Sequence, residues 1–356
     1  MTMAERVESR VVTVLKQLYA EFGLPRLIIA GFLVSLFILA FILKMNIGML
    51  VSDSLVRVGM NGILVLSMLY TLACGVGLNF GLAVGVIAGL VGAVTSMNFD
   101  LPGFTGFFAA IAIAVPIAVA LGWLYAELLE RVKGQEMMVG TYVGYSIVAG
   151  MCIFWVAAPY TNPAMIFPLG GAGLRTTLTL DRTWAKVLND FLAFRIGGLS
   201  IPTGLLLFFA LFCVASWLFF RSKAGHAMRM VGANPAYAQS SGINVRGIRR
   251  LGVILSTVLG AIGIIVYAQS YGFVQLYTAP LNVAFPAVAS ILIGGASLQR
   301  ATVGHVVLGA ILFHTLLTIA LPVTQTALSG TDISEIARMI MSNGMILYAL
   351  TRAERR

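Results

Sequence analysis

The feature that most constrains this sequence is a series of long apolar runs that recur from residue 27 almost to the C-terminus. A transmembrane helix needs about 20 apolar residues. In this chain of 356 residues, 59% are hydrophobic and 10% are charged, whereas an ordinary soluble domain has about 25% charged residues. The chain is therefore predicted to be an all-α polytopic membrane protein, and a soluble enzyme with one membrane anchor is excluded.

The lengths of the runs predict about ten transmembrane helices. These cover residues 27–43, 58–76, 79–96, 103–126, 136–157, 201–220, 251–270, 281–297, 303–321 and 333–351. The first run ends in Lys44-Met45-Asn46, with no small-residue cleavage site, so we interpret it as a retained span. Residues 46–57 are predicted to form a short helix that lies along the membrane before the second span.

Residues 1–26 are predicted to be a cytoplasmic segment with an amphipathic helix over residues 3–22, because apolar residues recur there at helical spacing. Such a helix can lie in the membrane interface, or it can pack on the protein itself. Residues 27–351 are predicted to form a single transmembrane domain. Residues 352–356 are predicted to be a cytoplasmic tail.

The basic residues predict the orientation, because Lys and Arg gather in cytoplasmic loops. With both termini in the cytoplasm, 16 of the 23 Lys and Arg residues fall on the cytoplasmic side. The opposite orientation would place only the other seven there. The same distribution accounts for the net charge of +10, so no nucleic-acid partner is expected.

Residues 74–81, Cys-Gly-Val-Gly-Leu-Asn-Phe-Gly, separate the second and third spans without any charged residue. They are either a helix break inside the bilayer or a tight turn, and irregular backbone at that depth must be buried in protein or line a cavity. Gly81, Gly85 and Gly89 form a double GxxxG pattern, which is typical of close contact between membrane helices.

Two loops are long. In the outer loop, 158–200, Asp181 is predicted to cap a helix whose apolar stripe includes Trp184 and Leu188. This helix either rests on the membrane or offers a docking surface to an outside partner. The inner loop, 221–250, has six Lys or Arg residues and no acidic residue. A turn at 232–235 is followed there by a predicted helix over 235–241, which Gly242 ends.

These inner-loop residues resemble the cytoplasmic coupling loop of ABC importer permeases of the branched-chain amino acid, simple sugar and nucleoside family, the ribose-type permeases. The matching positions predicted to couple to an ATPase are Gly232, Asn234, Pro235, Ala238, Gly242 and Ile243. A second match is Ser-Ile-Leu-Ile-Gly-Gly-Ala-Ser-Leu at 290–298, followed by Gly304 and Gly309. Residues 75–81 give a weaker match, and Gly77 stands where the sugar branch has Asp. The resemblance therefore implies the family but assigns no solute.

The resemblance implies a subunit of an importer in a bacterial cytoplasmic (inner) membrane that moves a small polar solute, a sugar, nucleoside or related metabolite before an amino acid. The implied partners are ATPase subunits, a second permease, identical or related, and an extracytoplasmic solute-binding protein. The chain has no Gly-Lys dipeptide and hence no phosphate-binding P-loop, so the chain itself is not expected to be an enzyme.

The alternative is a secondary transporter that works without an ATPase. Ion-driven carriers usually place an ionisable group deep in the membrane, and this chain has no Asp or Glu near the middle of a predicted span. Its three cysteines are not closely spaced, and it has no His-Glu-x-x-His motif. No metal site, cofactor or catalytic group is therefore expected, and each lone histidine is interpreted as a packing residue.

Neutral polar residues in or near the spans are the candidates for solute contact, because apolar helix faces offer a polar solute no hydrogen bonds. The candidates are Asn61, Asn79, Gln269, Gln275 and Asn282, with Phe285 as a possible stacking face. The alternative role for each amide is a hydrogen bond between helices. Asn79 is favoured because it lies in the predicted helix break, and Gln275 and Asn282 because they flank an outer turn.

Overall fold

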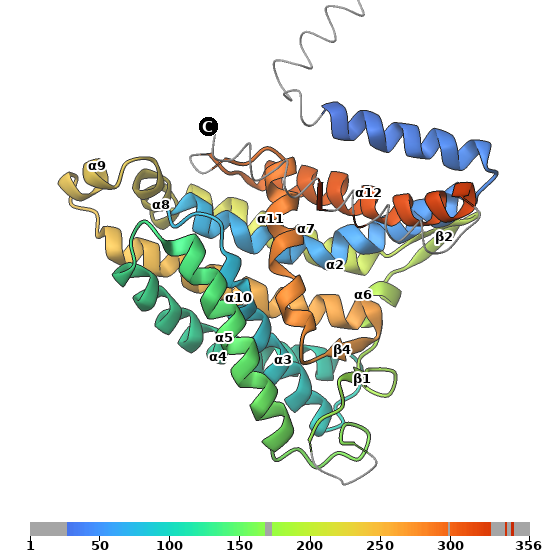
Figure 1. The fold of residues 1–356 in the computed structure, drawn as a ribbon, viewed down its shortest axis with the longest axis horizontal. Coiled ribbons are helices and arrows are strands. Elements are labelled where there is room, and N and C mark those ends of the chain that lie inside the picture. Colours follow the sequence, from blue (N-terminus) through green and yellow to red (C-terminus); the bar gives the residue numbers. More distant parts are fainter. Residues whose placement is uncertain (1–26, 168–172, 298–299, 329–338, 340–342, 345–356) are drawn as a thin grey trace, which may run out of the picture.

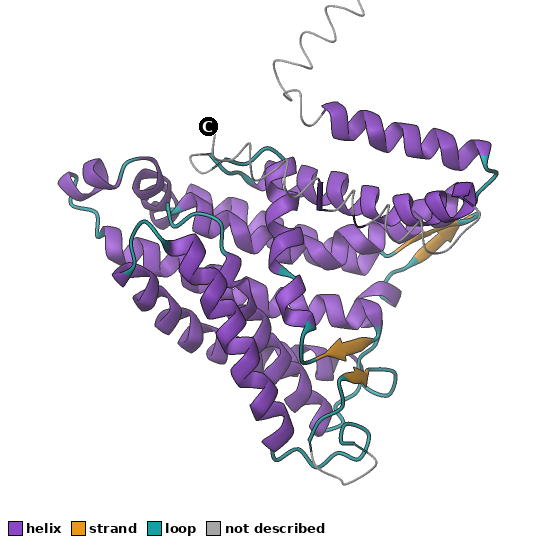
Figure 2. Ribbon diagram, viewed as in Figure 1, coloured by secondary structure: helices purple, strands orange, loops and turns teal. Residues whose placement is uncertain are grey.

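A computed structural model of the chain describes residues 27–167, 173–297, 300–328, 339 and 343–344. These residues are mostly helical, with two small sheets of two strands each (Figures 1 and 2). After a first helix, Leu27–Ile42, the elements are α2 Ile47–Ala73, η1 Phe80–Leu82, α3 Ala83–Asn98, α4 Gly103–Arg131, α5 Glu136–Ala157, β1 Thr177–Thr179, α6 Val187–Asp190, β2 Phe194–Ile196, β3 Leu199–Ile201, α7 Thr203–Arg221, α8 Lys223–Ala233, α9 Pro235–Ser240, α10 Val245–Tyr271, β4 Phe273–Gln275, η2 Ala279–Asn282, α11 Ala284–Ile293 and α12 Val303–Leu328.

Seven helices among the described residues are long and apolar enough to cross a membrane, and two shorter apolar helices accompany them. The shorter ones, Leu27–Ile42 and Ala279–Ile293, coincide with the predicted spans 27–43 and 281–297. The predicted helix 3–22 lies outside the described residues, as does the predicted span 333–351 apart from 339 and 343–344. The count of ten spans therefore stays a prediction.

The prediction of a separate helix over residues 46–57 is wrong. These residues are the first part of α2, which runs for 27 residues without interruption. Asn46 caps α2, because its side-chain oxygen accepts a hydrogen bond from the backbone nitrogen of Met49 at 3.1 Å. This segment contains no proline, and its glycines Gly59 and Gly62 pack against Leu205 and Phe209 of α7 within the helix. Asp53 and Arg57 therefore lie on the first three turns of α2.

The long helices α2 and α10 lie near the centre of the molecule and run antiparallel (Figure 1). Tyr70 of α2 lies beside Gly252 of α10, and Leu64 lies beside Gly263. The loop predicted to be inner, with α8 and α9, lies at one end of the long axis, and the hairpin of β2 and β3 lies at the other (Figure 1). We call the first of these the coupling end and the second the loop end.

Residues 74–81 form a reversal of the chain at the coupling end. Gly75 and Gly77 have φ of +74° and +97°, which suits glycine because it has no Cβ. Gly85 of α3 packs beside Thr257 and Gly89 packs beside Ala261, so α3 runs parallel to α10 and antiparallel to α2. Cys74, Val76, Leu78 and Asn79 are all buried, so the irregular backbone lies inside the protein.

The predicted close contact at the double GxxxG pattern is confirmed. A Cβ on Gly85 would overlap the carbonyl oxygen of Thr257 in α10, and one on Gly89 would overlap that of Ala261. A Cβ on Gly81 would meet the hydroxyl of Tyr125 in α4. The backbones of α3 and α10 therefore approach so closely that only glycine fits between them.

We expect Gly85→Ala to destabilise the fold by about 1–3 kcal/mol, the usual effect of overpacking, because the atom it would overlap is a backbone carbonyl that cannot rotate away. Gly150→Ala is the matched control, since it is also helical but has no atom within 4 Å of the added methyl. Thermal unfolding of the purified protein in detergent measures both. Equal stability of the two variants would contradict the packing of α3 on α10.

The loop end corrects two expectations. The predicted helix from Asp181 through Leu192 is reduced to α6, four residues long. It is interrupted because Lys186 adopts a left-handed conformation, with φ of +53°, and its backbone nitrogen donates to the carbonyl of Gln269 at 2.7 Å. Trp184 is fully buried against Phe107, with ring centroids 6.2 Å apart, so it faces neither membrane nor partner.

The fold is also not purely helical. In the loop end, β1 pairs with β4 in antiparallel register, with Thr177 opposite Gln275 and Leu178 opposite Val274. The second sheet is a hairpin in which β2 pairs with β3. The first pairing ties the long loop to the chain that follows α10, and it places Gln275 at the end of a strand.

Candidate functional site

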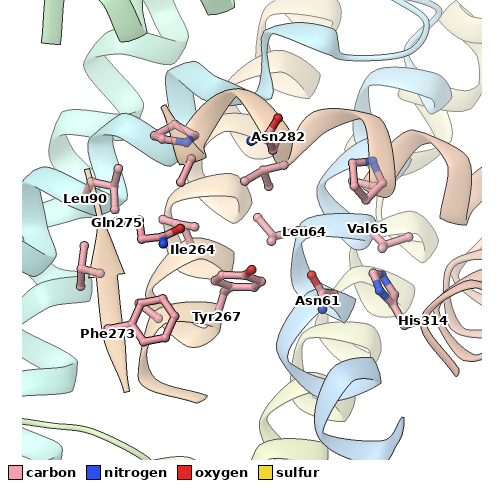
Figure 3. A pocket seen from close by; sticks show the side chains of 17 residues that line it. Asn61, Leu64, Val65, Leu90, Ile264, Tyr267, Phe273, Gln275, Asn282 and His314 are labelled. Carbon is pink, nitrogen blue, oxygen red and sulfur yellow. The ribbon is translucent and has the colours of Figure 1, made fainter. Parts of the chain in front are cut away.

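A cavity of about 260 Å³ lies between α2, α10 and the segment from β4 to α11 (Figure 3). Three of the predicted solute-contact residues, Asn61, Gln275 and Asn282, line it together although they come from distant parts of the sequence. Its other lining residues are mainly apolar and include Leu64, Leu90, Ile264, Phe273, Val283 and Ala287. An apolar pocket with a few convergent polar groups is the usual form of a small-molecule site.

The three amides retain hydrogen-bonding capacity. Gln275 and Asn282 are exposed, and within the described part of the chain no side-chain partner is found for either. The side-chain nitrogen of Asn61 donates to the carbonyl of Arg57 at 2.9 Å, which leaves its side-chain oxygen available. An amide that is not consumed by the fold can exchange hydrogen bonds with a solute.

A second cavity, of about 690 Å³, shares Asn61 and Tyr267 with the first and contains charged groups. These are Asp53, Arg57 and Lys186, near the loop end. The guanidinium of Arg57 lies over the ring of Tyr271, 4.7 Å from its centroid, a favourable cation–π contact. The two cavities therefore adjoin each other, with the charged groups in the larger one nearer the loop end.

Sequence reasoning missed His314 of α12, which lines both cavities. The sequence predicts only a packing role for it, because no pattern distinguishes a lone functional histidine in an apolar helix from a packing residue. Its side chain lies near Asn61 at one side of the pocket (Figure 3). A polar residue at the centre of a long apolar run, such as the run 303–321, was the only signal that could have identified it.

The structure places Asn79 outside these cavities. Its side-chain nitrogen donates to the hydroxyl of Ser256 at 2.9 Å, and its oxygen accepts from the hydroxyl of Tyr125 at 3.0 Å. Asn79 is 3% exposed. It therefore joins the reversal at 74–81 to α4 and α10, which is the alternative role of a hydrogen bond between helices, and it is not a cavity residue.

Gln269 and Phe285 also lie away from the smaller cavity. The side-chain oxygen of Gln269 accepts from the backbone nitrogen of Leu188 at 3.1 Å, and its nitrogen donates to Asn189 at 3.0 Å. Gln269 thus holds α6 against the end of α10. Phe285 packs against Phe80, with ring centroids 5.3 Å apart.

The predicted helix in the inner loop is present as α9, Pro235–Ser240. The side-chain oxygen of Asn234 caps it by accepting from the backbone nitrogen of Tyr237 at 3.0 Å. Gly242, with φ of +80°, turns the chain, and the backbone nitrogen of Ile243 donates to the carbonyl of Ala238 at 3.0 Å. The segment is therefore a compact, internally bonded unit.

Ala238 is fully buried within the subunit, whereas its neighbours in α9 are exposed. It can position α9 but cannot itself touch a partner. The exposed residues of α9 include Ala236, Tyr237 and Gln239, and the Tyr237 side chain is 61% exposed. Gly232 packs against the carbonyl of Ala73, so the loop rests on the end of α2 beside the reversal.

An ion-pair network lies at the same end. The guanidinium of Arg249 in α10 pairs with Glu130 of α4 at 2.8 Å and with Glu136 of α5 at 2.5 Å. The neighbouring Arg250 pairs with Glu127 at 2.7 Å, and Arg246 pairs with the same carboxylate. Sequence reasoning treated these arginines only as markers of the cytoplasmic side. They instead join three helices at the coupling end.

A family model described as the permease component of the branched-chain amino acid transport system matches residues 50–350. The chain belongs to this permease family. The resemblance seen in the sequence is thereby confirmed. The permease is 26% identical over 269 residues to the autoinducer 2 import system permease protein LsrC of Yersinia pestis (strain Pestoides F), covering 67% of this chain and 74% of the relative. It is 25% identical over 262 residues to LsrC of Photorhabdus luminescens, covering 65% and 76%.

A solved ABC transporter of the metal-chelate type, in an inward-facing conformation, aligns to the permease with a TM-score of 0.46 and 14% identity, covering 91% of this chain and 99% of the other. Family membership identifies the chain as the permease component of an ABC importer, a multi-pass protein of the inner membrane. An importer permease implies ATPase and solute-binding partners.

Proposed function

We propose that this permease conducts a small polar solute without net charge, a sugar, nucleoside or related metabolite, through the cavity lined by Asn61, Gln275 and Asn282. The observation that carries the proposal is the convergence of these three amides, with unused hydrogen-bonding capacity, in one apolar cavity. Amide groups both donate and accept hydrogen bonds, so they can replace the water that such a solute loses.

The electrostatics of the smaller cavity support a solute without net charge. None of the described residues that line it is Asp, Glu, Lys or Arg, so no full charge is available there to neutralise a buried ion. Phe273 and Tyr267 offer ring faces in the same cavity. The relatives named above are autoinducer 2 import permeases, which makes autoinducer 2 the first solute to test.

The proposal also assigns the two ends of the molecule. The coupling end, with α9, faces the cytoplasm and meets an ATPase subunit, and the loop end faces outwards and meets a solute-binding protein. Both chain termini are cytoplasmic, and residues 27–351 act as one transmembrane domain. A second permease, identical or related, completes the pathway. The basic inner loop 221–250 supports this orientation.

Uptake by proteoliposomes that contain the assembled transporter tests the pathway. We expect Gln275→Leu and Asn282→Leu each to lower uptake roughly two- to tenfold at limiting solute, the range for one lost neutral hydrogen bond. Gln325→Leu is the matched control, because Gln325 is an exposed amide of α12 that lines neither cavity. Unchanged uptake in both cavity variants would place the pathway elsewhere.

Thiol labelling tests the orientation. In a variant without Cys74, Cys152 and Cys213, we expect Arg182→Cys to react with a membrane-impermeant thiol reagent in intact spheroplasts. Ser240→Cys should react only after permeabilisation. Both replaced side chains are exposed, so a failure to react reports the side of the membrane and not burial. Labelling of both from outside would refute the proposed orientation.

A further inference from the structure

His314 is a buried polar residue with one ring nitrogen left without a hydrogen-bond partner. Its side chain is 7% exposed, and no partner for Nε2 is found among the residues that the structure describes. The residue lines both the smaller and the larger cavity. Leaving a buried polar group unpaired is unfavourable, so such a group calls for an explanation.

Other buried polar side chains in the helices either have hydrogen-bond partners or lie away from the cavities. Asn79 and Gln269 have partners for both their oxygen and their nitrogen. Within the described ranges, no partner is found for the ring nitrogen of Trp155 or Trp184 either, but neither residue lines either cavity. Among these groups, His314 is the one whose residue lines a cavity.

Asn61 supplies the complementary group. It also lines both cavities, and its side-chain nitrogen is already bonded to the carbonyl of Arg57, so its oxygen acts as an acceptor. A neutral imidazole with a hydrogen on Nε2 acts as a donor. A hydroxyl group donates one hydrogen bond and accepts others, so it can donate to Asn61 and accept from His314 at the same time.

We propose that His314 and Asn61 together bind a hydroxyl group of the solute at the junction of the two cavities, and that this pair makes the permease select hydroxylated solutes. The inference rests on the proposed function and assigns to this pair the recognition of a hydroxyl group of the solute. The junction is defined by the residues common to both cavities, which are Asn61, Tyr267, Pro286 and His314. These four residues border both cavities.

The ring of Tyr267 contributes the apolar side of the same junction. It packs on Tyr271, with ring centroids 4.7 Å apart, and Arg57 lies over Tyr271 in turn. A ring held in this way offers a flat face to the carbon skeleton of a solute. The hydroxyl pair and the ring together suit a compact, hydroxyl-bearing molecule better than a purely apolar one.

The first test locates His314 without knowledge of the solute. In the cysteine-free assembled transporter, His314→Cys should react with the water-soluble reagent 2-sulfonatoethyl methanethiosulfonate. The neighbouring Phe313→Cys should not react, because Phe313 is fully buried and lines neither cavity. If His314→Cys is as unreactive as Phe313→Cys, His314 does not lie on a water-filled route and the proposal is overturned.

The second test measures selectivity with D-ribose, uridine and L-leucine as probes, each supplied to proteoliposomes with the assembled transporter. For a hydroxylated probe that accumulates, His314→Leu should raise the KM roughly two- to tenfold, while kcat falls less. His314→Gln, which keeps a donor, should lie closer to wild type. At least one monodeoxy form of the probe should lose affinity in wild type but not further in His314→Leu.

The outcomes separate this inference from the proposed function. Accumulation of L-leucine alone, or an equal loss for the probe and all of its monodeoxy forms, refutes the hydroxyl assignment and leaves the amide-lined pathway standing. Loss of uptake in His314→Leu with unchanged uptake in Gln275→Leu and Asn282→Leu supports His314 while refuting the pathway. If none of the three probes accumulates, autoinducer 2 takes their place in the uptake test, and thiol labelling still decides the place of His314.

Discussion

Replacing Arg249 by leucine should destabilise the permease by about 3–5 kcal/mol, the range for breaking a buried ion pair. The side chain of Arg249 is 10% exposed, and those of its partners Glu130 and Glu136 are 6% and 12% exposed. Without the guanidinium, both carboxylates would remain in a poorly hydrated position. The carboxylates at the ends of α4 and α5 would then repel one another, and both helices would lose the link to α10 that Arg249 provides.

A triple variant tests directly whether the buried carboxylate charges cause the loss of stability. Arg249→Leu combined with Glu130→Gln and Glu136→Gln removes the carboxylate charges that Arg249 neutralises, and we expect it to recover more than half of the lost stability, although Glu130→Gln also gives up the ion pair of Glu130 with exposed Lys133 at 3.1 Å. Lys223→Leu is the control, because Lys223 is an exposed cation of the same loop and should change stability by less than about 0.5 kcal/mol. Unfolding in detergent, followed by helical content, measures all three. A triple variant no more stable than Arg249→Leu would show that the lost contacts, and not the charges, matter.

The network explains why the arginines of the inner loop cannot be understood from charge distribution alone. The sequence predicts their side of the membrane, because positive charges gather there. It does not predict that Arg249 pairs with glutamates more than 100 positions earlier, since three helices must first pack together. Arg249 also donates to the carbonyl of Gly75 at 3.4 Å, so the network contacts the reversal at 74–81.

Features with a local signal were predictable. The helices follow from apolar runs, the contact of Gly85 and Gly89 from their spacing, and α9 from the turn and glycine around it. The reversal at 74–81 was located, although its two interpretations could not be separated. Whether such a segment turns or breaks a helix depends on what packs around it, and neither Ser256 nor Tyr125 can be assigned to Asn79 from spacing.

The cavity was predictable only in part, because its residues are brought together by packing between distant parts of the sequence. Asn61, Gln275 and Asn282 were found because they are amides in or near apolar runs. That property does not distinguish them from Asn79 or Gln269, whose groups are consumed by partners in other elements. The elements α6 and β1 are held in place by long-range contacts with the end of α10 and the strand that follows it. No periodic pattern in the sequence therefore predicts these two elements.

The second large effect is expected at Tyr237. This tyrosine projects from α9 with 61% of its surface exposed, whereas Ala238 behind it is fully buried. Large exposed aromatic residues are frequent anchors of protein interfaces, where their truncation costs at least about 2 kcal/mol. An exposed tyrosine on a rigid, capped helix at the end of the molecule is therefore the best candidate for the group that an ATPase subunit holds.

We expect Tyr237→Ala to weaken binding of the ATPase subunit about 30-fold, the equivalent of 2 kcal/mol, and to lower uptake accordingly, while the stability of the permease itself changes little. Co-purification at graded ATPase concentrations and uptake by proteoliposomes measure the two effects. Tyr142→Ala is the matched control, because Tyr142 is 65% exposed but lies in α5, away from α9.

Ala238→Arg distinguishes direct contact of Tyr237 with the ATPase from correct placement of α9. A charged side chain forced into this fully buried place should dislodge α9 and abolish uptake even with Tyr237 intact. If Tyr237→Ala binds the ATPase and transports as wild type does, the coupling surface lies outside α9.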